Sequence, residues 1–176
     1  MYSQKTLFAL LLPVLISTSA IAARPTTSIP AQKPAVTLPS KATTNGLDAS
    51  AKARLVGEHK LTVQWLSWGG PRDAGKLVVK DLGSGLSAEG EQLGSGEYAG
   101  DYLKMSGKIV SASKDGFVFE GDILLRVHHN ANGEECKRSG TFTFKTKGGR
   151  KYWRLQEMDN PCDTVTDYVD VYFRGI

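Results

Sequence analysis

The sequence has few of the residues and motifs that signal a particular chemistry, and it has no long apolar run. Its longest apolar stretch, 7–16, holds about ten residues, half of what a membrane-spanning helix needs. The 19 glycines follow no three-residue period, which excludes a collagen-like array. No G-x-S-x-G, H-E-x-x-H or P-loop motif occurs, and the three histidines have no visible partner. We therefore predict no catalytic residues, cofactor or metal site, with an enzyme whose site converges only in three dimensions as the alternative.

The N-terminal part of the sequence predicts export. Lys5 precedes the apolar stretch and Ala20-Ile21-Ala22 fits the A-x-A cleavage pattern, so residues 1–22 are predicted to form a signal peptide. Residues 23–54 are rich in Pro, Thr and Lys and contain no aromatic residue, which is typical of a flexible linker. We expect a secreted or periplasmic protein with a folded domain at 55–176 and no membrane span after signal cleavage.

The formal net charge of +4 is unevenly placed. Most of the basic excess lies in the signal and linker, and the remainder of the chain is close to neutral, so nucleic acid is not an expected partner. One segment departs from this balance, because the basic residues from Lys137 to Arg154 are interrupted by no acid and an acidic stretch follows. Either two neighbouring strands pair their opposite charges, or the segment forms a basic patch for an acidic partner.

Alternation of apolar and polar residues dominates the chain from residue 59 onward. The clearest example is 117–128, within which Gly121 is expected to mark a bulge or a bend. The segment 83–96, rich in Gly and Ser, is expected to form a flexible connection or a lid. The remaining pattern predicts about eight short strands and no long helix. The expected strands are 61–65, 77–79, 98–106, 108–113, 117–128, 141–145, 152–156 and 167–173.

These strands predict an all-β fold. Each good strand has one apolar face, and a single sheet of this size would leave that face and two edges bare. We predict a small antiparallel meander closed into a roughly eight-stranded barrel, with a two-sheet β-sandwich as the alternative. The large apolar side chains of such a barrel either form a solid core or line a ligand cavity.

Cys136 and Cys162 are the only cysteines. An even pair in an exported protein predicts a disulfide bond. The competing interpretation is a reactive or metal-binding thiol near His128 and His129. Adjacent residues of a strand point to opposite faces, so the two histidines are not expected to serve one ion.

The outer face of the last two strands is the candidate binding surface. Tyrosine and arginine are common in recognition surfaces. The alternative is a purely structural face stabilised by a cross-strand pair of Arg154 and Asp170. Trp68 joins the candidates because Trp65 and Trp68 face opposite sides of a strand, which leaves one indole outside the core. The candidate residues are Tyr152, Arg154, Gln156, Tyr168, Asp170, Tyr172 and Trp68.

Together these observations predict a non-catalytic binding module. Its partner would be a small apolar ligand in the interior, or a protein or polysaccharide of the cell envelope on the tyrosine-rich face. A second possibility is an inhibitor of a secreted hydrolase, acting through a protruding loop at 83–97 or 157–166.

Overall fold

The structure is a computed structural model that describes residues 46–66 and 73–175. The predicted signal peptide, residues 23–45 of the predicted linker and Trp68 lie outside these residues. Within the described part of the chain, no helix is both long and apolar enough to cross a membrane.

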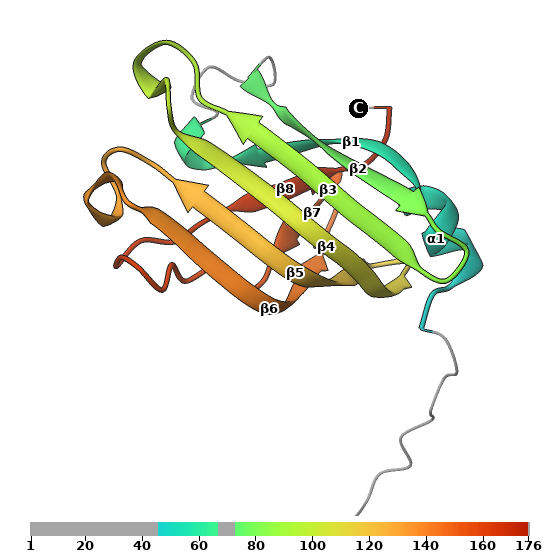
Figure 1. Ribbon diagram of the computed structural model, residues 1–176. Helices are drawn as coiled ribbons and strands as arrows, with labels where there is room; N and C mark the ends of the chain where they lie inside the picture. Colours follow the sequence, from blue (N-terminus) through green and yellow to red (C-terminus); the bar gives the residue numbers. More distant parts are fainter. Residues whose placement is uncertain (1–45, 67–72, 176) are drawn as a thin grey trace, which may run out of the picture. The chain divides into compact units, whose positions relative to one another are not determined.

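Eight antiparallel strands form a closed barrel in sequence order (Figure 1). Each strand pairs with the next along the chain, and the last strand pairs with the first. The predicted barrel is therefore confirmed, and the sandwich alternative is excluded because Leu61 and Val63 pair directly with Val171 and Val169. The strands are β1 (Gly57–Val63), β2 (Gly75–Asp81), β3 (Leu86–Leu93), β4 (Tyr102–Ser113), β5 (Gly116–Arg126), β6 (Glu135–Lys145), β7 (Tyr152–Leu155) and β8 (Val169–Tyr172).

Large side chains from all around the barrel fill its interior. The rings of Phe117 and Phe144 stack with their centroids 4.8 Å apart, and Trp153 meets Phe117 edge-on at 5.6 Å. Phe119 fits because Gly107 and Gly121 face each other across β4 and β5, and its Cζ lies 2.8 Å from where a Cβ would stand at either glycine. The interior is thus a packed core built of interlocking rings and small residues.

Three predictions about the strands were wrong. β3 occupies most of the segment 83–96 that was expected to be a flexible connection, and β4 is one strand where two were expected. The bulge lies in β4 between Ile109 and Ser111, whereas Gly121 pairs regularly with Gly107. Gly121 therefore serves close packing against Phe119 and not a bend.

The predicted linker was too long at its C-terminal end. Residues Ala49–Leu55 form helix α1. Asp48 caps its N-terminus, because its Oδ1 accepts a hydrogen bond of 3.2 Å from the Ser50 amide. Ala51 and Leu55 are buried in the core cluster of the barrel, so this segment belongs to the folded unit. Figure 1 shows α1 beside the β2–β3 turn, at the end of the barrel where β8 finishes.

Candidate functional site

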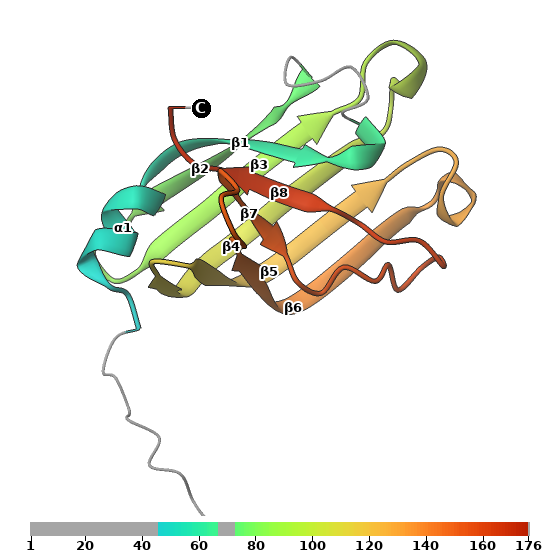
Figure 2. The ribbon, with the colours of Figure 1, turned by 180° about the vertical axis from the view of Figure 1, so that it is seen from behind.

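The outer side of β7 and β8 gathers most of the predicted binding residues. Tyr152 pairs with Tyr172 and Arg154 with Asp170, which places all four side chains on one face. Tyr168 precedes β8 and is 40% exposed. We call these five residues the tyrosine face; β7 and β8 face the viewer in Figure 2.

Arg154 is the centre of the tyrosine face. Its Nε and Nη2 each donate a 2.7 Å hydrogen bond to the Asp170 carboxylate, so the predicted cross-strand pair is present. The guanidinium Cζ also lies 4.4 Å from the ring centroid of Tyr168 and 5.3 Å from that of Tyr152. The bond to Asp170 raises the pKa of Arg154, while burial raises the pKa of Asp170. The pair with Asp170 therefore holds the guanidinium close to the rings of both Tyr152 and Tyr168.

The other predicted surface residues contribute less to this face. Gln156 follows β7 and is exposed, and its amide donates to the carbonyl oxygen of Arg154. Trp65 is partly buried and donates its Nε1 hydrogen to Asp167 Oδ1 over 3.0 Å. Of the two tryptophans in this segment, Trp65 therefore has a structural role.

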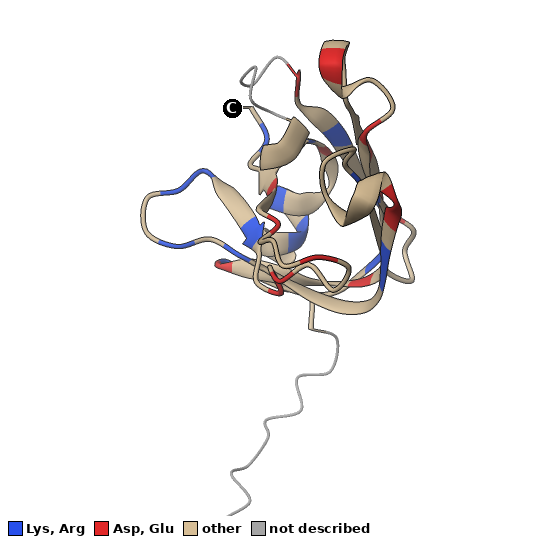
Figure 3. Ribbon diagram, turned by 90° about the vertical axis from the view of Figure 1, so that its left-hand side faces the viewer, with Lys and Arg blue, Asp and Glu red and all other residues tan. Residues whose placement is uncertain are grey.

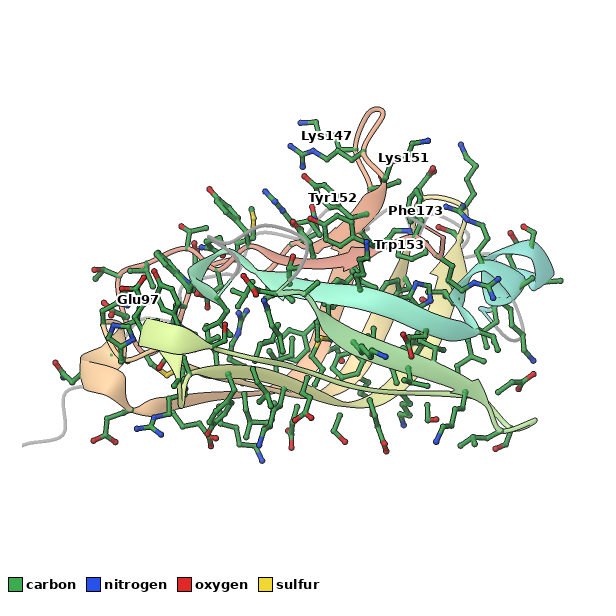
Figure 4. The ribbon with its side chains drawn as sticks, turned by 90° about the horizontal axis from the view of Figure 1, so that it is seen from above. Glu97, Lys147, Lys151, Tyr152, Trp153 and Phe173 are labelled. Carbon is green, nitrogen blue, oxygen red and sulfur yellow. A yellow bond between two sulfur atoms is a disulfide. The ribbon has the colours of Figure 1, made fainter. Side chains whose placement is uncertain are left out.

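A basic hairpin borders the tyrosine face. The β6–β7 connection projects from the barrel, with Lys147 and Lys151 labelled on it in Figure 4 and blue basic residues along it in Figure 3. Arg150 reaches the Tyr152 ring at 5.7 Å. Across residues 46–66 and 73–175, none of the salt bridges involves Lys145 or the basic residues of this hairpin, whereas Lys137 and Arg154 are paired on their strands. The cross-strand interpretation of the basic segment is therefore confirmed at Arg154, which pairs with Asp170, and the basic patch for an acidic partner stays a prediction.

The predicted disulfide is present. Cys136 on β6 and Cys162 in the β7–β8 loop are bonded, with their Cα atoms 5.9 Å apart and a sequence separation of 26. The interpretation as a reactive or metal-binding thiol is therefore excluded. The same loop is held at a second point, where Asp163 Oδ2 accepts a 2.7 Å hydrogen bond from the Ala131 amide.

A buried polar cluster lies beneath this loop. The Asp167 side chain accepts hydrogen bonds from Trp65 and from Asn160 Nδ2 at 3.0 Å each, and Arg138 Nη1 is 3.8 Å from it. Burial raises the pKa of Asp167 and lowers that of Arg138. Arg138 also donates to the Glu157 carbonyl, so its charge is used to hold the loop end in place.

A second polar site was missed from the sequence. His128 Nδ1 lies 2.7 Å from Oδ2 of the buried Asp101, and its Nε2 lies 3.4 Å from His129 Nδ1. The expectation that these histidines point apart was wrong because β5 ends at Arg126 and both lie in the turn that follows. The turn sequence at 130–133 was the available signal, since it implies that regular strand geometry has already ended.

The fold and these features define a class of protein: an up-and-down β-barrel of eight strands with a packed core, a short N-terminal helix and one disulfide. The chain belongs to the PM1083 family, whose family model matches residues 43–173. It is similar to the Uncharacterized protein PM1083 of Pasteurella multocida (strain Pm70), with 40% identity over 120 residues, which are 68% of this chain and 74% of that protein. No solved structure is significantly similar to the chain. The family match begins before α1, in keeping with the inclusion of that helix in the fold.

Proposed function

We propose that this chain is an exported, non-catalytic binding protein that contacts a protein partner of the cell envelope through the tyrosine face. The observation that carries this proposal is the contact of Arg154 with the rings of Tyr152 and Tyr168 while two hydrogen bonds to Asp170 hold its guanidinium in place. Such a group is rigid before it meets a partner, so less conformational entropy is lost on binding. Partly exposed tyrosine rings supply both apolar area and a hydroxyl at the tip.

The neighbouring hairpin suggests the charge of the partner. Lys145, Lys147, Arg150 and Lys151 form a basic border beside the tyrosine face. A border of this kind attracts an acidic surface and increases the rate of association more than the final affinity. The proposed partner is therefore a protein whose contact surface has aromatic or apolar groups at its centre and carboxylates at its edge.

The structure favours the outer face over the other predicted modes. An apolar ligand would have to displace packed rings from the barrel interior. The inhibitor alternative relied on two loops, but β3 replaces one and the disulfide and Asp163 tie down the other. The pair of Asp101 and His128 brings a carboxylate to a histidine, but the second nitrogen of His128 meets His129 and not a hydroxyl nucleophile.

Export is part of the proposal. The predicted signal peptide supports it, and an intrachain disulfide is compatible with an oxidising compartment outside the cytoplasm. The intact mass of the protein from an envelope fraction is expected to correspond to a chain that begins at Ala23. A mass that retains residues 1–22 would contradict export by this route.

The binding proposal is tested with paired surface variants. The Tyr152→Ala/Tyr168→Ala variant leaves the Arg154–Asp170 pair in place, and Tyr102→Ala on β4 is the matched control. After crosslinking in intact envelopes, we expect the paired variant to lose a defined crosslinked partner that the wild type and the control retain. Thermal unfolding checks that all three are folded. Equal crosslinking of the three proteins would refute the role of the tyrosine face, and a partner digested by glycosidases would identify a polysaccharide instead.

A further inference from the structure

The connections at one end of the barrel are acidic. This end, which we call the loop end, carries the β1–β2, β3–β4, β5–β6 and β7–β8 connections. Figure 3 shows the loop end toward the viewer, with acidic residues along its loops. The described residues of these four connections include no Lys or Arg and eight acidic residues: Asp73, Glu97, Asp101, Glu134, Glu157, Asp159, Asp163 and Asp167.

The connections at the other end have the opposite charge. This end, which we call the helix end, carries α1, the β2–β3, β4–β5 and β6–β7 turns and the residues after β8 (Figure 1). The only acidic residues of these segments are Asp48, which caps α1, and Asp115. The barrel is therefore polarised along its axis, with a positive field at the helix end. The basic residues of the helix end are Lys52, Arg54, Lys114, Lys147, Arg150, Lys151 and Arg174.

Hydrogen bonds hold the basic segments of the helix end against one another. Arg54 on α1 donates from Nη1 to the Lys114 carbonyl oxygen over 2.9 Å, which joins the helix to the β4–β5 turn. The Thr146 amide donates to the Asp115 carbonyl oxygen over 2.8 Å, which joins that turn to the β6–β7 turn. The positive charges are thus carried by one continuous surface.

Acidic side chains neutralise only part of this surface. Lys52 Nζ lies 2.7 Å from the carboxylate of Asp81 at the end of β2, and Lys114 Nζ lies 3.4 Å from that of Asp115. The basic residues of the β6–β7 turn take part in none of the salt bridges among the described residues. Their charge is available to an anionic partner.

Exposed apolar side chains lie at the same end. Leu82 in the β2–β3 turn is 64% exposed, Val110 on β4 is 38% exposed, and both line a groove beside α1. A Cβ at Gly83 or Gly85 would have no heavy atom within 4 Å, so the turn around Leu82 stands clear of its surroundings. A projecting apolar side chain with basic residues beside it is typical of proteins that bind anionic membrane surfaces.

We propose that the helix end binds the surface of a membrane that contains anionic phospholipids, with the Leu82 side chain entering the headgroup region. The basic segments are attracted to the lipid phosphates and the acidic loop end is repelled, so the loop end faces the solvent. This inference goes beyond the proposed function, because it concerns one end of the barrel and a lipid, whereas the proposed function concerns the tyrosine face and a protein.

The experiment is co-sedimentation of the untagged chain from residue 23 with vesicles. One set consists of phosphatidylcholine, and the other of equal parts of phosphatidylcholine and phosphatidylglycerol. We expect binding only to the anionic vesicles. Raising NaCl from about 0.1 M to about 1 M shortens the Debye length from about 10 Å to about 3 Å and is expected to release the protein. Absence of binding to the anionic vesicles at the lower salt concentration overturns the proposal.

A paired charge reversal tests whether the helix end makes the contact. Lys114→Glu/Lys147→Glu is expected to weaken binding to anionic vesicles by more than about tenfold, since each basic residue at such a surface contributes about fivefold. Lys60→Glu/Lys104→Glu changes the net charge equally at exposed positions of β1 and β4 and is the matched control. Equal weakening by the two variants would show that net charge alone decides binding, and would overturn the proposal.

A second pair tests the apolar contact. Leu82→Ser is expected to weaken binding by about three- to tenfold. Leu93→Ser changes a residue that is 58% exposed where β3 reaches the loop end, and is expected to bind like the wild type. Equal binding by these two variants would exclude entry of Leu82 into the headgroup region. Thermal unfolding checks that every variant is folded.

The same measurements separate this proposal from two others. Because the vesicles contain no protein, a failure to bind them leaves the tyrosine face untouched. Analytical ultracentrifugation at low salt without lipid tests whether the oppositely charged ends of two chains bind each other instead. Association of this kind, together with unoccupied vesicles, overturns the membrane proposal.

Discussion

Arg154 and Asp170 stand opposite each other on β7 and β8 and are joined by two hydrogen bonds of 2.7 Å. Asp170 is 5% exposed, so the arginine compensates a largely buried carboxylate. Arg154→Ala would leave that carboxylate unpaired, and we expect it to lower the free energy of unfolding by about 2–3 kcal/mol. Urea denaturation at neutral pH measures the change.

A neighbouring residue provides the control for this prediction. Lys145 pairs with Arg154 across β6 and β7 but is exposed, so Lys145→Ala is expected to change stability by less than about 0.5 kcal/mol. If Arg154→Ala lowers the free energy of unfolding as little as Lys145→Ala does, the Arg154–Asp170 pair contributes no more to stability than a surface ion pair.

The buried carboxylate of Asp167 predicts a specific pH dependence. Burial raises its pKa above the ordinary 3.8, so the folded chain holds this proton more tightly than the unfolded chain does. The resulting stabilisation is fully present below about pH 4 and is lost as pH rises through the raised pKa. Relative to Asp167→Asn, whose amide does not titrate, the wild type is therefore expected to lose stability with rising pH in urea titrations.

Asp163 should behave in the opposite way. Hydrogen bonds from the amides of Ala131 and Thr164 lower its pKa, so its contribution is present above the ordinary pKa and is lost as pH falls. Relative to Asp163→Asn, the wild type is expected to gain stability as pH rises. If the stability difference between wild type and the Asn variant changed with pH in the same direction for Asp163 and Asp167, the environments of the two carboxylates would not differ as described.

The disulfide closes the loop that carries the buried polar cluster. Because Cys136 and Cys162 are 26 positions apart in sequence, removal of the bond is expected to lower stability by about 3.5 kcal/mol through the greater entropy of the unfolded chain. Thermal unfolding of the wild type with and without reductant measures the change, and the Cys136→Ala/Cys162→Ala variant should not respond to reductant. Alkylation of the native protein without reductant would contradict the bond.

The contact between Phe119 and the facing glycines predicts that a single methyl group is harmful. A Cβ at Gly121 would lie 2.3 Å from the Ser106 carbonyl oxygen as well as against the ring. Gly121→Ala is expected to lower the free energy of unfolding by about 1–3 kcal/mol because strand β5 must move. Gly149→Ala, where nothing lies within 4 Å, is the control and should have little effect on the same urea curve.

β3 shows why part of the barrel could not be recognised from the sequence. Its inward positions include Gly90 and Gln92, so the apolar alternation that marks the other strands is weak. Gly90 is small because a Cβ there would meet the Lys76 carbonyl oxygen at 2.5 Å, and Gln92 is polar because its Oε1 accepts the Val63 amide hydrogen. Both residues are explained by contacts with neighbouring strands, so the local sequence does not indicate that this segment is a strand.

The same contrast applies to the candidate sites. The tyrosine face follows from a two-residue period on two short strands, so its residues were predictable, although whether they bind a partner stays a prediction. The histidine pair was not predictable, because its convergence depends on where β5 ends and on Asp101, which is 27 residues away in sequence.

By itself, the sequence determined the antiparallel all-β meander, the disulfide and the polar outer face of β7 and β8. These follow from local alternation, from turn residues and from the pairing of two cysteines. Only the tertiary structure decided that the sheet closes into a barrel and not a sandwich, that α1 belongs to the fold, that β3 is a strand and that His128 and His129 meet. Each of these depends on contacts between distant segments, whose energies appear only when the chain has closed.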